Sequence, residues 1–275
     1  MIVKTDAIVM KSMRYRETSK IVTFYTRRYG KLAAVAKGAR DTKSKFGASL
    51  EPMTGVALVV YKKEHRDLQL VSQCDIIRPY KKIHADMDRM AVALSILELL
   101  HQLTHDEEEN PVLFTLVVDA LDALEGSSGV LMNFFYAFEL RLARVFGFAP
   151  EMDRCVRCGR SFPAERTTET IVFQLDKGGI LCDTCAESER SRAPSIERVA
   201  AGSDRGRPPA AVSIRIPTAR VMQRLYQADL SSVGTLEYTA AVGNELDATL
   251  RSYLRYHFED LKPLKTTEVF GKIAP

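Results

Sequence analysis

The chain has 275 residues, and 46% of them are apolar, which is enough to build two or three packed units. Met1 leads directly into Ile2 and Val3 without a secretory signal pattern, and the longest apolar runs, 56–61 and 91–100, are too short to span a bilayer. Length and composition therefore exclude a membrane protein and a small secreted scaffold, and they predict a multidomain cytoplasmic protein.

Charge is distributed unevenly along the chain. Residues 1–80 carry 16 Lys and Arg against 7 Asp and Glu, a balance of +9, whereas the whole chain has a net charge of only +4. A basic end joined to an acidic remainder favours a polyanionic partner for the N-terminal end. A solvated surface rich in lysine explains the charge equally well.

The first eighty residues contain short apolar segments punctuated by glycines. Strands are predicted over 7–10, 21–25, 32–36, 56–61 and 68–77. Alternation in the last segment divides its side chains between one face, with Leu68, Leu70, Cys74 and Ile76, and the other, with Gln69, Gln73 and Asp75. Five short strands in about seventy residues are typical of an oligonucleotide-binding (OB) barrel, with an SH3-like barrel as the main alternative.

Beyond Pro79 the apolar spacing changes to that of helices. Helices are predicted over 87–103, 111–124, 131–146, 218–229 and 235–258. Residues 187–211 are rich in charge, Ala, Ser, Gly and Pro and have almost no apolar periodicity, which predicts a loop or linker.

Together these patterns predict a multidomain α+β fold in five parts. An OB-type barrel occupies 1–80, a helical domain 81–150 and an inserted four-cysteine module 151–186. A linker over 187–213 then leads to helices in 214–275 that pack on the helical domain.

Two Cys-x-x-Cys pairs predict a metal site. Cys155 and Cys158 form the first pair, and Cys182 and Cys185 form the second. Four thiolates in this spacing are typical of a structural zinc ion in a zinc-ribbon-like module, with no open position for catalysis. Disulfides, a redox pair and an iron–sulfur cluster are weaker alternatives. Cys74, on a strand, is expected to be a buried apolar residue.

No catalytic motif accompanies the metal site. The sequence lacks a phosphate-binding loop, a dinucleotide fingerprint, a zinc-protease helix and a nucleophile elbow. A zinc hydrolase or nuclease is therefore the weaker interpretation, and a protein without enzymatic activity is expected.

Cations gather at the end of the first strand and between the third and fourth strands. The candidate DNA-binding residues are Arg14, Arg16, Lys37, Arg40, Lys43, Lys45 and Phe46. Cations release counterions from phosphates, and Phe46 would stack on a base. The alternative is a solvated loop with Phe46 packed back on the barrel.

The pattern of residues 15–22, 29–31 and 37–40, followed by the two cysteine pairs and Gly178-Gly179, resembles RecO, a bacterial family of recombination mediators. The resemblance implies binding to single- and double-stranded DNA and annealing of complementary strands. It also implies partnership with RecR and single-stranded DNA-binding protein to load RecA, and a cytoplasmic, nucleoid-associated location.

No nucleotide hydrolysis is implied, and some members of the family lack the cysteines. Arg141 and Arg144 are candidates for contacting the acidic tail of single-stranded DNA-binding protein. The alternative reading of the residues is an RNA- or transcription-associated protein with a barrel and a zinc ribbon.

Overall fold

The structure is a computed structural model that describes residues 1–64, 66–161, 169–192, 197–198 and 208–266. It divides into two compact units, Met1–Glu125 and Gly126–Pro275. This boundary falls inside the helical domain predicted over 81–150, and the five-part division of the chain stays a prediction.

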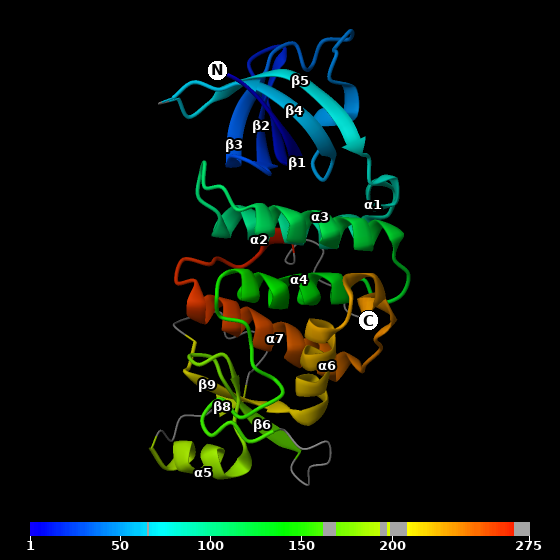
Figure 1. The fold of residues 1–275 in the computed structure, drawn as a ribbon. Coiled ribbons are helices and arrows are strands. Elements are labelled where there is room, and N and C mark those ends of the chain that lie inside the picture. Colours follow the sequence, from blue (N-terminus) through cyan, green and yellow to red (C-terminus); the bar gives the residue numbers. More distant parts are fainter. Residues whose placement is uncertain (65, 162–168, 193–196, 199–207, 267–275) are drawn as a thin grey trace. The chain divides into compact units, whose positions relative to one another are not determined.

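Five strands close into a barrel in the first unit (Figure 1). They are β1 Ile2–Tyr15, β2 Ser19–Thr26, β3 Gly30–Ala36, β4 Gly55–Tyr61 and β5 Gln69–Arg78. The order β1-β2-β3-β5-β4, with β3 and β5 parallel and β1 closing on β4, is that of an OB barrel and confirms the predicted fold class. The long β1 serves two neighbours because a bulge between Val9 and Lys11 bends it.

The side chains of β5 do not alternate as predicted. Gln69 is only 4% exposed, whereas Leu68 and Ile76 are 38% and 44% exposed. The register against β4 shifts between Val59 and Val60, which changes the inward side between Gln69 and Cys74, and it shifts again between Gly55 and Val56, next to Ile76. A bulge of this kind reverses the facing of every residue beyond it, and simple alternation cannot reveal it.

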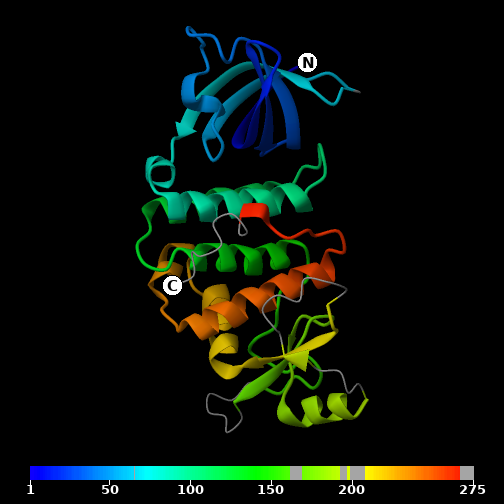
Figure 2. The same ribbon diagram turned by 180° about the vertical axis from the view of Figure 1, so that it is seen from behind.

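Three helices complete the first unit: α1 Lys81–Ala85, α2 Met87–Leu103 and α3 Pro111–Gly126. Asp86 caps α2 by accepting hydrogen bonds from the amides of Asp88 and Arg89. Figure 2 shows these helices and the barrel from behind. The rings of Tyr25 on β2 and Phe114 on α3 stack with centroids 6.3 Å apart, which ties the barrel to the helices.

The second unit combines helices with a small sheet. Its helices are α4 Met132–Val145, α5 Asp183–Arg192, α6 Ile216–Gln227 and α7 Ala240–His257, with a 3-10 turn, η2, over Leu230–Thr235. Its strands are β6 Thr170–Gln174, β7 Gly179–Ile180, β8 Glu197–Arg198 and β9 Ala211–Arg215, in the order β7-β6-β9-β8. β6 and β7 form an antiparallel hairpin that leads into the second cysteine pair.

The loop predicted over 187–213 is wrong for part of that range. Residues Glu187–Arg192 belong to α5, and Ala211–Ser213 belong to β9, which pairs with β6 along its length. Val212 and Ile214 are buried while Ser213 between them is half-buried. Two inward residues are too few to show as periodicity, and the pairing partner lies about forty residues earlier. Residues 193–196 and 199–207 lie outside the described part of the chain.

Candidate nucleic-acid groove and metal centre

A groove of about 630 Å³ opens on the barrel where three segments meet. These segments are the β1–β2 turn, the end of β3 and the loop that leads into β5. The groove is lined by Tyr15, Arg16, Glu17, Thr18, Ser19, Val35, Lys37, Arg66, Leu68, Gln69 and Leu70. The β1–β2 and β4–β5 connections are the loops that OB barrels use for oligonucleotides.

Cations line this groove around an apolar floor. Arg16, Lys37 and Arg66 are all exposed, and within the described part of the chain no carboxylate pairs with any of them. Val35 and Leu70 are half-buried, and Leu68 is 38% exposed, so they offer apolar surface between the charges. Phosphates attract cations and base faces attract apolar surface, so this combination suits a single nucleic-acid strand.

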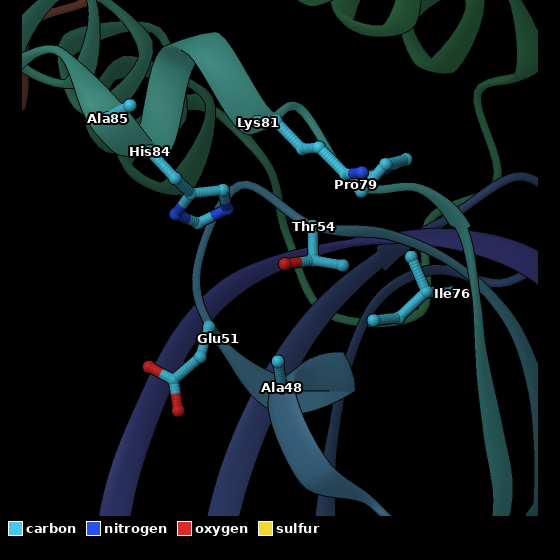
Figure 3. A pocket seen from close by; sticks show the side chains of 8 residues that line it. All are labelled: Ala48, Glu51, Thr54, Ile76, Pro79, Lys81, His84 and Ala85. Carbon is cyan, nitrogen blue, oxygen red and sulfur yellow. The ribbon is translucent and has the colours of Figure 1, made fainter.

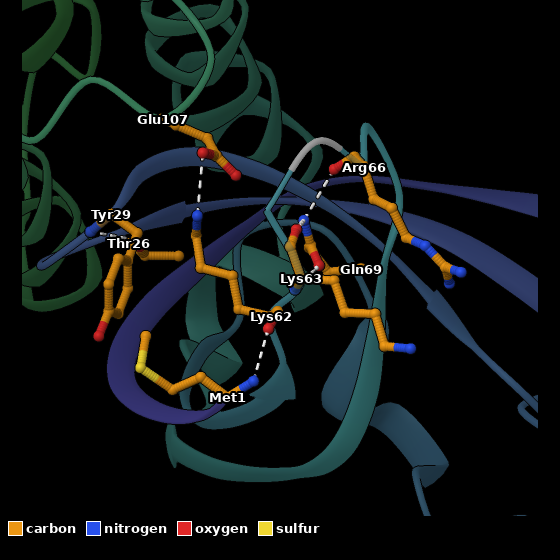
Figure 4. Close-up of polar contacts among 8 residues, drawn as sticks. All are labelled: Met1, Thr26, Tyr29, Lys62, Lys63, Arg66, Gln69 and Glu107. Atoms are coloured by element: carbon orange, nitrogen blue, oxygen red, sulfur yellow. Dashed lines mark hydrogen bonds and ion pairs between the residues drawn. The ribbon is translucent and has the colours of Figure 1, made fainter.

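Local contacts fix the backbone on two sides of the groove. Arg16 has a φ of +51°, a left-handed conformation that a side chain normally avoids, and its guanidinium lies 5.2 Å from the centre of the Tyr15 ring. Buried Gln69 fixes the opposite loop. Its amide nitrogen donates to the carbonyl oxygens of Arg66 and Lys63 at 2.8 and 3.1 Å, and its oxygen accepts from the Lys63 amide at 2.8 Å (Figure 4).

The predicted DNA-binding cations occupy different surroundings. Arg16 and Lys37 line the groove, whereas Arg14 and Lys43 are exposed outside its lining. Arg40 donates from Nη1 to the Glu17 carbonyl at 2.8 Å and to that of Arg16 at 3.4 Å. Lys45 donates to the Ser72 carbonyl at 2.6 Å. The binding role of each of these residues stays a prediction.

Phe46 does not offer a stacking surface in this structure. It is only 4% exposed and belongs to the apolar core of the barrel, with the Lys45 ammonium 5.1 Å from its ring centre. This is the packing that the alternative interpretation of the loop expected. Its burial follows from the short turn Gly47–Leu50, which directs the loop back onto the barrel.

Among the groove residues that were not sequence candidates, Arg66 is the cation and Tyr15 is the aromatic residue. Arg66 belongs to a charged loop between two strands, and Tyr15 ends the first strand beside Arg16. A cation in the β4–β5 loop of a predicted OB barrel was the available signal for Arg66, because that loop borders the ligand face in this fold.

A second cavity, of about 390 Å³, lies between the barrel and α1 (Figure 3). Lys81, His84 and Ala85 line it from α1, and the barrel contributes Ala48, Glu51, Thr54 and Ile76. Glu51 pairs with Lys20 at 2.9 Å. Each lining contains one carboxylate, Glu51 here and Glu17 in the groove, but this cavity has one lysine where the groove has three cations, so it is less suited to a phosphate chain.

The acidic segment after α2 is exposed over residues 105–109 and also contacts the barrel. Lys31 reaches Asp106 at 3.4 Å and the Thr104 carbonyl at 2.6 Å. Lys62 pairs with Glu107 at 2.9 Å (Figure 4). Two barrel cations are therefore already neutralised, and neither lines the groove.

The four predicted metal ligands come together in the second unit. The sulfur atoms of Cys155, Cys158, Cys182 and Cys185 all lie within 4.8 Å of one another. Gly159, with a φ of +72°, lets the first knuckle turn, and its amide donates to the Cys155 carbonyl at 2.9 Å. Four convergent thiols could hold one metal ion and leave no ligand position for a substrate.

The surroundings of the thiols favour an anionic sulfur at Cys155 and a protonated one at Cys185. Burial raises the pKa of Cys155, but backbone amides of the two knuckles donate to its sulfur and bring that pKa down to about 6. The pKa of Cys185 is raised to about 12, chiefly by its hydrogen bond to Cys182. The cluster without a cation therefore cannot hold four thiolates, and a bound cation would supply the missing charge.

Cys74 is apart from this cluster, as expected. It is 5% exposed in the barrel core, where burial raises its pKa to about 11.

The two arginines proposed for a partner contact differ in their surroundings. Arg141 is half-buried and caps α6, donating to the Leu225 carbonyl at 3.1 Å and to that of Ala228. Burial lowers its pKa. Arg144 is exposed on the last turn of α4. Only Arg144 presents its charge to solvent, and the partner role of both stays a prediction.

No helix in the described part of the chain is long and apolar enough to cross a membrane.

Comparison with known proteins identifies the family. Residues 1–80 match the family model described as Recombination protein O N terminal, and residues 84–201 match Recombination protein O C terminal. The chain is 32% identical to the DNA repair protein RecO of Salinibacter ruber, over 99% of this chain and 94% of that protein. It is 29% identical to that of Chloroherpeton thalassium over the full length of both chains, and 32% identical to that of Desulforamulus reducens over 99% of this chain. Its OB barrel, its four-cysteine cluster and these matches place the chain in the RecO family of DNA repair proteins.

Proposed function

We propose that this protein binds DNA in the barrel groove and anneals complementary strands as a recombination mediator. The observation that carries the proposal is the groove itself, where Arg16, Lys37 and Arg66 are exposed and have no carboxylate partner among the described residues, around a floor of Val35, Leu68 and Leu70. Membership of a DNA repair family supports it.

Binding would begin at the phosphates. Each phosphate that a cation contacts releases part of its counterion atmosphere, and this entropy gain drives sequence-independent binding. The groove cations come from three separate segments of the barrel, so together they can follow a backbone instead of holding a single phosphate.

Annealing would follow from charge neutralisation. Two complementary strands repel each other through their phosphates, and a cationic surface lowers that repulsion while contacts to the backbone leave base edges free to pair. This step needs no nucleotide hydrolysis. The same surface would bind duplex DNA through its phosphates alone.

The wider role follows from the family resemblance. In this proposal the protein acts with RecR on DNA coated by single-stranded DNA-binding protein and so promotes RecA loading. Exposed Arg144 is the remaining candidate for contact with the acidic tail of the coating protein.

The metal in this proposal is one structural zinc ion. Zinc–sulfur bonds of about 2.3 Å in a tetrahedron place the sulfurs about 3.8 Å apart. Cys158 Sγ and Cys182 Sγ are 3.7 Å apart, which fits. When bound, the ion would cross-link the two knuckles and hold the chain between β7 and α5.

An annealing assay tests the function. Complementary oligonucleotides coated with single-stranded DNA-binding protein are mixed with the protein, without nucleotide, and duplex formation is followed by energy transfer. The triple variant Arg16→Glu, Lys37→Glu and Arg66→Glu should lose most of the annealing rate. A control with the same charge change at exposed residues outside the groove, Lys81→Glu, Lys82→Glu and Lys177→Glu, should keep most of it.

Equal losses in the two triple variants would show that overall charge, and not the groove, promotes annealing. No annealing by the unmodified protein would count against a mediator. A clear preference for RNA over DNA of the same sequence would favour an RNA-associated role instead.

A further inference from the structure

Arg40 makes three hydrogen bonds to one turn of the barrel. Its backbone amide donates to the Thr18 carbonyl at 2.9 Å. Its Nη1 donates to the carbonyls of Glu17 at 2.8 Å and Arg16 at 3.4 Å. One residue in the loop after β3 therefore engages three successive carbonyls of the β1–β2 turn.

That turn forms one side of the groove. All five residues from Tyr15 to Ser19 line it. Arg16 stands there in a left-handed conformation, which is unfavourable for a residue with a side chain and persists only where its surroundings hold it. The contacts from Arg40 supply such a restraint beside Arg16 itself.

We propose that Arg40 is a positioning residue of the groove: it holds the β1–β2 turn so that the Arg16 guanidinium faces the DNA, and it adds little phosphate binding of its own. The inference rests on the proposed binding of DNA in this groove. It separates Arg40 from the other cations of its loop. Lys43 is exposed, and within the described residues its ammonium makes no hydrogen bond or ion pair.

The conservative variant Arg40→Lys tests whether Arg40 acts through its charge or by holding the β1–β2 turn in place. Arg40→Lys keeps the charge but loses the planar fork whose Nη1 reaches two carbonyls, because an ammonium ends a shorter side chain. If Arg40 acts through its charge, Arg40→Lys should bind DNA like the unmodified protein. If it positions the turn, Arg40→Lys should resemble Arg40→Ala.

A double-mutant cycle measures the dependence on Arg16. Affinity for a labelled oligothymidine is measured by fluorescence anisotropy for Arg16→Ala, Arg40→Ala and the double variant, with Lys43→Ala as the matched cation in the same loop. We expect Arg40→Ala to weaken binding about as much as Arg16→Ala, and the double variant to lie within about twofold of either, because coupled residues are not additive. When Arg16→Ala and Lys43→Ala are combined, their fold-losses in DNA affinity should multiply. Multiplying losses for Arg16 and Arg40, or normal binding by Arg40→Lys, would overturn the proposal.

Hydrogen exchange of the free protein provides a readout without DNA. In peptides that cover residues 15–20, amides should exchange several-fold faster in Arg40→Ala and Arg40→Lys, and at the unmodified rate in Lys43→Ala. Unchanged exchange in the Arg40 variants would overturn the positioning role and leave DNA binding by the groove intact. Faster exchange with unchanged DNA affinity in every variant, Arg16→Ala included, would instead overturn the groove as the DNA site and the positioning role with it.

Discussion

Gly30 is the residue on which the docked acidic segment depends most directly. Its φ is +58°, and a Cβ built on it would lie 2.0 Å from the carbonyl oxygen of Glu108. Real side chains never approach a carbonyl so closely, so any larger residue at this position must push the segment away from the barrel.

Gly30→Ala should lower the free energy of unfolding by roughly 2 kcal/mol or more, because it combines backbone strain with a steric clash. Urea unfolding followed by circular dichroism measures the change. Gly47→Ala is the matched control, since Gly47 has a φ of +50° but no atom within 4 Å of the added Cβ. Gly47→Ala should lower the free energy of unfolding only by the cost of a left-handed backbone, about 1 kcal/mol. If Gly30→Ala and Gly47→Ala lowered the free energy of unfolding equally, the close approach of the Glu108 carbonyl oxygen to Gly30 would be contradicted.

Glu139 on α4 is a carboxyl group in an apolar interior, only 6% exposed. Burial raises its pKa well above the usual value, and the neighbouring Asp247 carboxylate raises it further, while Arg251 opposes this. Asp247 itself pairs with Arg251. The folded protein therefore keeps a proton on Glu139 that the unfolded chain releases near pH 4.5.

This proton makes stability depend on pH. Its contribution is fully present below about pH 4.5 and is lost as the pH rises toward the raised pKa of the folded state. Glu139→Gln cannot release a proton, so it should melt a few degrees higher than the unmodified protein at pH 8, with a smaller difference at pH 5. Differential scanning calorimetry at both pH values measures this. A difference that is the same at pH 5 and pH 8 would show that Glu139 does not titrate as described.

At the scale of the elements, the cysteine cluster joins short segments that pack around a small apolar core, which includes Cys155, Val172 and Leu181. β7 has only two residues, and the first knuckle is held by a few backbone bonds, among them Val156 N to the Ile180 carbonyl at 3.0 Å. A metal bound by all four thiolates would therefore contribute much of the folding energy of this part of the second unit.

Cys155→Ser should remove the metal and lower the melting temperature by roughly 10 °C, while affinity for DNA changes less than about threefold. Elemental analysis for zinc, with calorimetry and anisotropy on the same samples, measures all three. Cys74→Ser is the control, because Cys74 is a buried cysteine outside the cluster, and it should retain one zinc ion per chain. Full zinc content in Cys155→Ser, or loss of DNA binding in a folded variant, would contradict this division of roles.

The elements also show what a sequence can and cannot predict. The limits of α2 and the cysteine knuckles follow from local signals, namely a capping Asp86 and Cys-x-x-Cys spacing. Short apolar segments predict that the five barrel strands exist but not their limits, since β1 spans Ile2–Tyr15 where 7–10 was predicted. A bulge against β4 determines which side chains of β5 point into the barrel, and β9 forms because it pairs with β6. Both depend on how one strand pairs with another, which no local pattern encodes.

The same limit applies to the candidate site. Charge and fold class identified Arg16 and Lys37, which line the groove. They could not show that Arg40 and Arg141 donate to carbonyl oxygens or that Phe46 is buried in the barrel. A side chain's type indicates what it can bind, but only the fold determines which partner it meets.

At the scale of the whole molecule, the two compact units carry different chemistry. The basic groove belongs to the unit Met1–Glu125, and the cysteine cluster belongs to the unit Gly126–Pro275. If the proposed function holds, this division would separate DNA binding from metal-dependent folding. Loss of the metal should therefore leave the groove and its salt dependence unchanged.

The salt dependence of binding to oligothymidine tests the groove most directly. Three phosphate contacts contribute about 2 to the slope of log K against log salt concentration, at about 0.7 for each contact on a single strand. The triple variant Arg16→Ala, Lys37→Ala and Arg66→Ala should bind more weakly and lose a slope of about 2. A slope equal to that of the unmodified protein would contradict the assignment of the groove as the DNA site.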